Sequence, residues 1–346
     1  MAKDTVVIVG LDVSDRFSSY CMIDALSGEV IEEGKVATRA ASISARFDAK
    51  TPLRVVLETG THATWIARLL RGLGHEAVVA DARRLRFIWG SERKDDEVDA
   101  RKLAKVGRLD PSLLHPVRTR SPETDRGLAV LRSRDVLVET RTKLVNSLRG
   151  QMKRMGRPLP RLTTAAFAAK AREHVPEELL PVFGPMLDAV AALTAQIRVY
   201  DEQVEELCAA RPETAKLRQV KGVGPVTALA YALVVDDPSR FAKSRQVGPY
   251  LGLAPGRDQS GDTDKQLRVT RAGDKLLRRL LVGSAHYVLG PFGPDTDLRR
   301  WGLLRAARGG GQGKKRAVVA VARRLSVLLH ALWVGGEPYR PLLAAT

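Results

Sequence analysis

A short apolar run near the start of the chain constrains the fold more than any other feature of the sequence. Residues 5–11 read TVVIVGL, which is typical of a strand buried in the middle of a sheet. A helix is expected at 63–73, and further strands at 18–24, 29–37, 54–58 and 75–80. In this prediction the first three strands form a meander and the later ones join through helical crossovers, so the chain opens with an α/β domain.

The pattern downstream of this domain is helical. A charged and then periodic segment predicts a helix at 92–109 that ends before Asp110-Pro111, and 122–152 is expected to form a long helix. Residues 217–334 are expected to form a compact, mainly α-helical domain. We therefore divide the chain into an N-terminal domain at 1–118, a helical coiled-coil-like arm at 119–212 and a C-terminal domain at 213–346.

The second helix of the arm has a repeating pattern. From Phe183 to Cys208 its inward positions recur at alternating spacings of four and three residues, as in a coiled-coil seam. Two interpretations fit. The seam can pack against the first arm helix of the same chain, or it can form an arm through which two copies dimerise. Thr194 and Asp201 interrupt the apolar seam, so the pattern leaves both open.

The charge balance points to a polyanionic partner. The formal net charge is +18, and residues 255–324 hold 16 Lys and Arg against 6 acids. Such an excess favours nucleic acid, because neutralised phosphates release counterions. No apolar run reaches the roughly 20 residues of a membrane-spanning helix. The two cysteines do not make a disulfide framework. We expect a cytoplasmic protein that binds nucleic acid and no membrane.

Four carboxylates could share metal ions. Asp12 directly follows the first apolar strand, and Glu58 ends another. If these strands are parallel neighbours, both acids emerge at the same edge of the sheet. Asp96 and Asp99 are three residues apart and so share a helix face, which Leu103 continues toward the sheet. Clustered oxygen donors suit hard divalent cations, which can activate a nucleophile on phosphate.

These segments resemble a known family. GLDVS, LETG and KDDEVDA, in this order, look like the motifs of the RuvC-like, ribonuclease-H-type domain of the insertion sequence 110 family of transposases. The resemblance implies a DEDD tetrad at Asp12, Glu58, Asp96 and Asp99, with two Mg²⁺ ions, or Mn²⁺, per site. The family motif commonly has Thr where this chain has Asp95. The third acid is therefore Asp95 or Asp96, and the spacing to Asp99 favours Asp96.

Two features of the basic C-terminal domain bear on phosphate chemistry. Residues 220–225, VKGVGP, look like a helix-hairpin-helix turn. Its glycines and the N-terminus of the following helix could approach a phosphate. The alternative interpretation is a plain tight turn between two helices. Ser260 precedes Gly261 in a polar loop rich in Arg and Lys. It could attack phosphate if a base or metal activated it, although Ser-Gly is also an ordinary turn sequence.

The stretch from RFAKSRQVGPYLGLAPGRDQSG to RVTRAGDKLLRRLLVGSA resembles the C-terminal transposase domain of the same family, and 315–334 resembles its closing helix. In that family the serine before glycine is the nucleophile, and Ser260 matches it. The resemblance implies a phosphoserine link to DNA and domains contributed by different protomers of a dimer or tetramer. It also implies a structured noncoding bridge RNA that guides recognition of donor and target DNA near the bacterial nucleoid.

Nucleic-acid contacts are expected mainly from the basic domain. The candidate residues are Lys221, Gly222, Gly224, Arg257, Arg268, Arg271, Lys275, Arg278, Lys314 and Lys315.

Two other functions fit the same sequence. A junction-resolving nuclease would use the carboxylates to hydrolyse DNA with water and would not need Ser260. A non-catalytic basic nucleic-acid-binding protein would need neither the serine nor the acids. The histidines show no metal-ligand spacing and no CxxC is present, so zinc is not expected.

Overall fold

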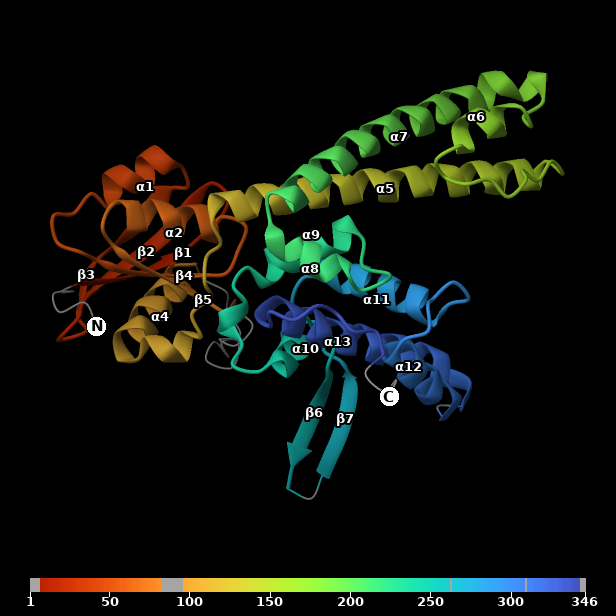
Figure 1. The fold of residues 1–346 in the computed structure, drawn as a ribbon. Coiled ribbons are helices and arrows are strands. Elements are labelled where there is room, and N and C mark those ends of the chain that lie inside the picture. Colours follow the sequence, from red (N-terminus) through yellow and green to blue (C-terminus); the bar gives the residue numbers. More distant parts are fainter. Residues whose placement is uncertain (1–6, 83–95, 262, 309, 343–346) are drawn as a thin grey trace. The chain divides into compact units, whose positions relative to one another are not determined.

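The computed structural model describes residues 7–82, 96–261, 263–308 and 310–342, in two compact units, Met1–Ser121 and Pro122–Thr346. The first unit is built on a five-stranded sheet with the order β3-β2-β1-β4-β5 (Figure 1). β1 pairs antiparallel with β2 and parallel with β4. The strands are β1 (Val7–Asp12), β2 (Phe17–Asp24), β3 (Val30–Ala37), β4 (Arg54–Glu58) and β5 (Glu76–Ala80). The predicted meander and parallel crossovers are confirmed, within a mixed α/β unit.

Two helical layers cover the sheet. Side chains at alternate strand positions face opposite sides, and each side has its own core. Val9 and Val55 belong to the core that also holds residues of α1 (Ala40–Arg46) and α2 (Ala63–Gly72). Ile8 and Val56 belong to the second core, with residues of α4 (Asp96–Leu109). The predicted helix at 92–109 is confirmed from residue 96, and residues 92–95 lie outside the described part.

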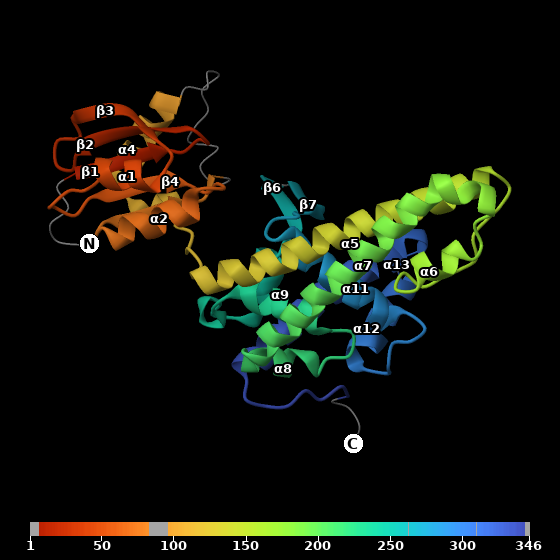
Figure 2. The ribbon, with the colours of Figure 1, turned by 90° about the horizontal axis from the view of Figure 1, so that it is seen from above.

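The second unit begins with a long helical hairpin. It comprises α5 (Pro122–Arg154), α6 (Phe167–Arg172) and α7 (Leu180–Ala209), and α5 and α7 lie side by side (Figures 1 and 2). The seam of α7 is buried against its own chain from Phe183 to Cys208, and half-buried Asp201 pairs with Arg134 of α5 at 2.6 Å. The interpretation as packed helices within one chain is thus confirmed. A dimerising arm stays a prediction.

The rest of this unit is mainly helical, as predicted, and shares its core with the base of the hairpin. Leu131 and Val204, at the base of the arm, pack into the same cluster as residues of α9, α11 and α13. No break in packing therefore separates the arm from the C-terminal helices. These helices are α8 (Pro212–Arg218), α9 (Pro225–Val235), α10 (Val247–Tyr250), α11 (Lys275–Leu289), α12 (Asp297–Arg308) and α13 (Gly313–Val334).

A two-stranded β-hairpin interrupts these helices. β6 (Pro255–Ser260) and β7 (Thr263–Val269) pair antiparallel where the sequence analysis expected a polar loop, and that expectation was wrong. The strands carry few apolar residues, so they lack the alternation that marks a half-buried strand. Cross-strand pairing supports them instead: Arg257 binds both carboxylate oxygens of Asp264, at 2.8 and 2.6 Å.

Two segments, Glu177–Ala209 and Gly310–Val334, are long and apolar enough to cross a membrane by length and composition alone. The expectation that no segment reaches this length was therefore wrong. Packing accounts for the apolar content of both. α7 buries its seam against α5, and α13 buries residues such as Val321 and Leu325 in the core of the second unit.

Candidate active site

Two neighbouring strands bring the first two predicted acids to one edge of the sheet. β1 and β4 run parallel with Leu11 opposite Leu57, so Asp12 and Glu58, one residue further on, are neighbours. Leu11 and Leu57 belong to the core under α1 and α2. Because strand side chains alternate, Asp12 and Glu58 both face the other side, which α4 covers. Both acids are half-buried.

Gly10 allows α4 to lie directly on this part of the sheet. A Cβ atom at residue 10 would stand 2.5 Å from the Ala104 amide nitrogen and would overlap the Ala100 carbonyl. Further along the helix, a Cβ atom at Gly107 would lie 3.6 Å from Ile8 Cγ2. Since residue 107 lies near the start of β1 and residue 100 near its end, α4 runs antiparallel to β1. The N-terminus of α4 therefore lies toward the strand ends.

That N-terminus carries the other two predicted acids. Asp96 is the first residue of α4 and is four residues before Ala100, so both lie on the helix face that meets the sheet. Asp99 is half-buried, and its carboxylate is 3.5 Å from Lys102 Nζ. Asp12 and Glu58 thus lie at the strand ends, and exposed Asp96 and half-buried Asp99 lie at the helix terminus that points toward those ends; we call these four residues the acid corner.

The acid corner is not a closed metal cage. Among the described residues, no three His, Cys, Asp or Glu side chains lie close enough to hold one ion. The chemistry of the four donors nevertheless fits Mg²⁺ or Mn²⁺, which take carboxylate oxygens and keep several waters. Asp95 lies outside the described residues, so the choice between Asp95 and Asp96 stays a prediction.

Ion pairs fasten α4 to the meander beside the acid corner. Arg101 donates to both carboxylate oxygens of Glu33 on β3, at 2.7 and 2.6 Å, and the hydrogen bond lowers the pKa of Glu33. Lys35 Nζ lies 3.2 Å from Glu97. Beneath these pairs, burial and then the nearby Glu33 raise the pKa of the Cys21 thiol to about 12. These contacts hold the first turns of α4 against the sheet.

Ser260 stands at the tip of the β6–β7 hairpin. It is the last residue of β6, it is exposed, and Gly261 follows it with a positive φ of 53°. Figure 1 shows the hairpin projecting from the helices of the second unit. The Ser260 hydroxyl forms no hydrogen bond with another residue that the structure describes. The hydroxyl is therefore displayed at the surface of the second unit.

The base of the hairpin is held far more tightly than its tip. Gly252 and Gly273, with φ of 67° and 74°, bring the two chain segments so close that a Cβ atom at either would overlap the opposite backbone. Arg278 of α11 donates from Nη1 to the carbonyls of Leu251 at 3.2 Å and Ala272 at 2.6 Å. We call these five residues the hairpin clamp; it fixes where both strands leave the helical core.

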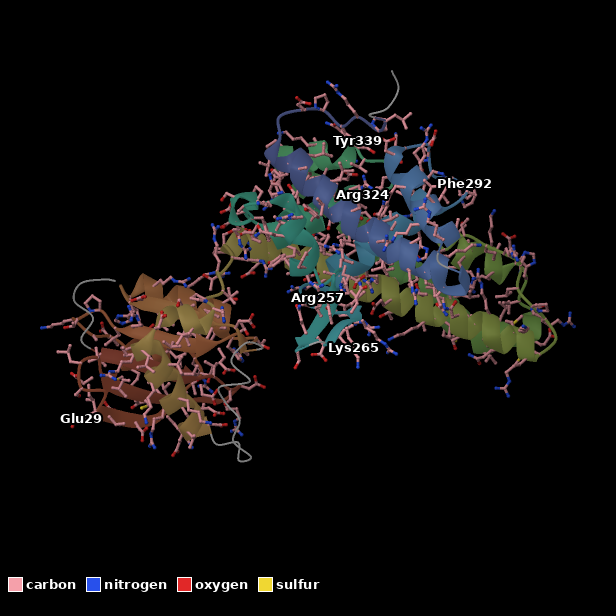
Figure 3. The ribbon with its side chains drawn as sticks, turned by 90° about the horizontal axis from the view of Figure 1, so that it is seen from below. Glu29, Arg257, Lys265, Phe292, Arg324 and Tyr339 are labelled. Carbon is pink, nitrogen blue, oxygen red and sulfur yellow. The ribbon has the colours of Figure 1, made fainter. Side chains whose placement is uncertain are left out.

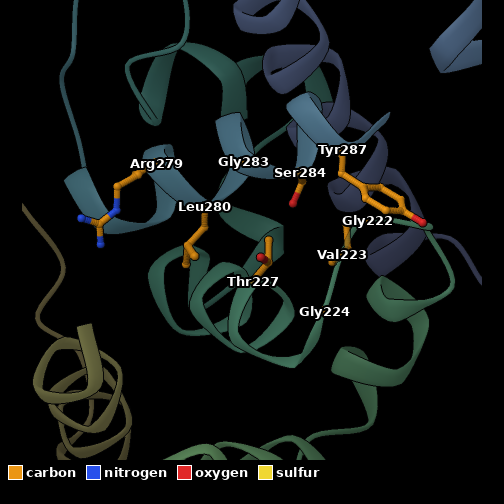
Figure 4. A pocket seen from close by; sticks show the side chains of 9 residues that line it. All are labelled: Gly222, Val223, Gly224, Thr227, Arg279, Leu280, Gly283, Ser284 and Tyr287. Carbon is orange, nitrogen blue, oxygen red and sulfur yellow. The ribbon is translucent and has the colours of Figure 1, made fainter. Parts of the chain in front are cut away.

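The predicted helix-hairpin-helix-like turn joins α8 to α9. Gly222 has a φ of 93°, and a Cβ atom there would lie 2.7 Å from Tyr287 Cδ1. Pro225 at the first helical position removes one N–H, which leaves fewer amides for a phosphate than expected. An open pocket of about 500 Å³ lies beside the turn (Figure 4), lined by Gly222, Val223, Gly224, Thr227, Arg279, Leu280, Gly283, Ser284 and Tyr287.

The pocket includes residues that the sequence analysis missed. Thr227, Ser284 and Tyr287 come from two helices, and no local motif marks them. Arg279 also lines the pocket, but its guanidinium pairs with Asp135 and with a second acid of α5. The positive charge of Arg279 is therefore already paired with carboxylates of the same chain. Phosphate binding at this turn stays a prediction.

The other predicted nucleic-acid contacts fall into two groups. Arg257 pairs with Asp264, and Arg278 belongs to the hairpin clamp, so both have structural partners. The remaining side chains are exposed: Lys221, Arg268, Arg271, Lys275, Lys314 and Lys315.

Two family models match the chain. Residues 9–156 match a DEDD model whose description is "Transposase", and residues 214–296 match the model described as "Transposase IS116/IS110/IS902 family". The first match contains the acid corner, and the second contains the β6–β7 hairpin with Ser260.

Curated relatives align with this chain, two of them along nearly its whole length. The transposase for insertion sequence element IS1111A of Coxiella burnetii is 27% identical, over 97% of this chain and 92% of the relative. A probable family 20 transposase of Pseudomonas aeruginosa is 28% identical, over 96% of this chain and 98% of its own length. The pilin gene-inverting protein of Moraxella lacunata is 26% identical over 49% of this chain and 53% of the relative.

Proposed function

This chain belongs to the IS110/IS116 family of insertion sequence transposases, and we propose that it cuts and rejoins DNA with the acid corner and Ser260 acting on one scissile phosphate. The observation that carries the proposal is the pairing of Asp12 with Glu58 at the end of parallel strands, under the acidic N-terminus of α4. The meander followed by two parallel strands supports a RuvC-like, ribonuclease-H-type first unit.

The acid corner supplies the charge that the chemistry needs. We propose that Asp12, Glu58, Asp96 and Asp99 hold two Mg²⁺ ions, or Mn²⁺. Such ions, when bound, lower the pKa of a nucleophile and stabilise the leaving oxygen on a phosphate. The carboxylates would hold these ions and balance their charge, and three of the four, Asp12, Glu58 and Asp99, are half-buried, which limits access of bulk water.

Ser260 supplies the nucleophile. Its Oγ attacks the phosphorus of the scissile phosphate and its proton passes to a base. The bond between phosphorus and a deoxyribose oxygen breaks, and that oxygen leaves as a hydroxyl. The phosphoserine link is resolved when a hydroxyl of the recombining strand attacks the same phosphorus and returns the proton to Ser260. In this proposal the acid corner, from the same chain or from another protomer, completes the site around Ser260.

The partners follow from the family and the charge. Donor and target DNA are the substrates, and a structured noncoding RNA guides their recognition. A dimer or tetramer would bring acid corners and hairpins of different protomers together. The net charge of +18 suits a protein that handles several nucleic-acid strands in the bacterial cytoplasm.

A covalent adduct tests this function directly. Purified protein, element-end DNA, Mg²⁺ and the co-expressed flanking RNA should yield a denaturant-resistant protein–DNA adduct. Ser260→Ala should abolish the adduct, and Asp12→Asn should reduce it by about a hundred- to a thousandfold, because loss of one such stabilising group typically costs that much. Asp15→Asn is the matched control, since Asp15 is 94% exposed and close in sequence.

The outcomes separate the rival functions. A junction-resolving nuclease would still cut DNA with Ser260→Ala but not with Asp12→Asn. A non-catalytic binding protein would form no adduct, and neither substitution would change DNA binding. Unchanged adduct formation by Ser260→Ala would refute the serine mechanism.

A further inference from the structure

A long basic stretch without acids ends the second unit. From Leu298 to Gly336 the sequence has nine Arg and Lys residues and no Asp or Glu. Arg299 donates to carbonyls at the end of α11, and Arg300 pairs with Asp295. Within the described ranges, the other cations of this stretch form no ion pair; they are Arg305, Arg308, Lys314, Lys315, Arg316, Arg323 and Arg324.

Three of these cations share the exposed face of α13. Arg316, Arg323 and Arg324 are exposed, while Val321 and Leu325 turn into the core. Arg316 and Arg323 are seven residues apart, which is about 10 Å along a helix. Ala320 lies between them on the same face, and its small side chain does not project beyond the helix surface. A polyanion could therefore lie along this face without steric hindrance from the helix.

Contacts place Arg323 beside the base of the Ser260 hairpin. Its Cγ lies 3.0 Å from where a Cβ atom of Gly248 would stand, so the Arg323 stem crosses α10. The chain then runs from α10 through Gly252 of the hairpin clamp into β6. Figure 3 views the second unit from the side on which the hairpin projects, with Arg324 on α13 and Arg257 on the hairpin labelled.

An aromatic ring holds the neighbouring cations in place. The Arg324 guanidinium lies 4.7 Å from the centre of the Trp301 ring, and that of Arg305 lies 5.7 Å from it. Stacking on a ring orients a guanidinium without neutralising its charge. Arg324 is thus ordered, while its charge stays available to an outside partner.

We propose that Arg316, Arg323 and Arg324, the α13 strip, bind the phosphate backbone of the DNA duplex whose strand Ser260 attacks. This inference rests on the proposed function. Charge without acidic partners favours phosphate over a protein partner, and the position beside the hairpin base favours the reacting DNA over a separate guide RNA. The strip contacts backbone only, so it positions the duplex without reading its sequence.

Binding measurements with the full chain test the strip. The variant Arg323→Gln/Arg324→Gln keeps most of each stem and removes two charges. Lys153→Gln/Arg154→Gln is the matched control, because these cations are exposed near the tip of the arm. A labelled DNA duplex of arbitrary sequence and a labelled RNA hairpin are titrated over a range of salt concentrations, all in a Ser260→Ala background so that binding is measured apart from chemistry.

The strip variant should bind duplex DNA roughly tenfold more weakly at low salt. The slope of log affinity against log salt should fall by about 2, since each lost phosphate contact removes roughly 0.9. The control should retain its slope. An unchanged slope, an equal loss in the control or a loss confined to RNA would overturn the inference. If the protein with Ser260 intact formed no adduct while the slope still changed in the Ser260→Ala background, the result would instead count against the proposed function alone.

Discussion

The acid corner and the Ser260 hairpin are built in opposite ways. The acid corner lies at the end of two central strands, and a helix covers it at a point where only glycine fits. The hairpin has no core of its own, and its serine is exposed at the tip. Its order comes from the clamp at its base. The position of the acid corner is thus fixed by core packing in the first unit. Ser260 is instead exposed to solvent, and its position is fixed only at the base of the hairpin.

This difference suits the two proposed tasks. Carboxylates that share metal ions must be held against their mutual repulsion, which a packed sheet and helix can do. A nucleophile that must reach a phosphate on another molecule needs exposure and reach. Substitutions that disturb packing anywhere in the first unit should therefore impair the acid corner. The position of the hairpin should instead be impaired mainly by substitutions in its clamp.

Among the glycines that the structure describes, Gly10 is where an added methyl group would come closest to a neighbouring backbone, so we expect the largest effect from Gly10→Ala. The new Cβ atom would stand 2.5 Å from the Ala104 amide nitrogen, so α4 must shift away from β1. Overpacking of this kind costs about 3 kcal/mol, and it also moves Asp96 and Asp99 away from the strand ends. Chemical denaturation should show the loss of stability, and the Ser260 adduct should disappear.

Gly72→Ala is the control for that substitution. Gly72 lies in α2 of the same unit, and a Cβ atom there would meet nothing within 4 Å. Alanine favours the helix by up to about 1 kcal/mol, so stability should stay equal or rise. Equal destabilisation by both variants would show that the close approach of α4 to β1 does not govern this unit.

The same contrast explains what the sequence could predict. The five strands and the opening meander followed from apolar runs and from turn signals such as Ser27-Gly28, because a buried sheet forces local sequence to be apolar. The position of the acids followed from strand ends, since parallel neighbours share an edge. The sequence placed Glu58 next to Asp12 on the condition that their strands are parallel neighbours, and the register of β1 and β4 confirms that condition.

The hairpin and its surroundings could not be predicted in this way. Its strands face solvent on both sides, so no periodicity marks them, and a Gly or Ser in a polar stretch indicates only a turn. The clamp depends on Arg278 meeting carbonyls more than five residues away in the chain. The α13 strip likewise depends on Trp301 and Arg324 meeting across two helices. Such long-range contacts leave no local pattern.

Gly252→Ala should show how much the clamp, as distinct from the tip of the hairpin, positions Ser260. Residue 252 has a φ of 67° and its Cβ atom would overlap the Ala272 backbone, so the two segments must part. The hairpin then leaves the core in a different direction. A misplacement of about 1 Å can cost roughly 100-fold in rate, so adduct formation should fall by that order.

Gly261→Ala carries the same backbone strain without the crowding. Its φ is 53°, and a Cβ atom there would meet nothing within 4 Å. The strain of about 1 kcal/mol is confined to the exposed turn, and adduct formation should fall far less than with Gly252→Ala. If the Gly261→Ala variant were the more impaired, the tip and not the clamp would position Ser260.

Cys21 provides the mildest probe of the acid corner, because it reports packing without any substitution. Cys21 lies opposite Gly10 in the register of β1 and β2, in the core that α4 covers, and its side chain is fully buried. Burial and then Glu33 raise its pKa to about 12. The thiol therefore stays protonated from pH 7 to 9 in the folded protein, and only a rise in pH toward 12 or the loss of burial would yield the reactive thiolate.

A thiol-specific reagent at pH 8 should thus leave Cys21 unmodified in the native protein and modify it on unfolding, which peptide mass spectrometry can follow separately from buried Cys208. The Gly10→Ala variant should expose Cys21 earlier, because lifting α4 removes the cover that raises its pKa. The Gly252→Ala variant should not, since the clamp lies in the other unit. Rapid modification of Cys21 in the wild-type protein would mean that α4 opens readily, and the acid corner would then be no more rigid than the hairpin it is contrasted with.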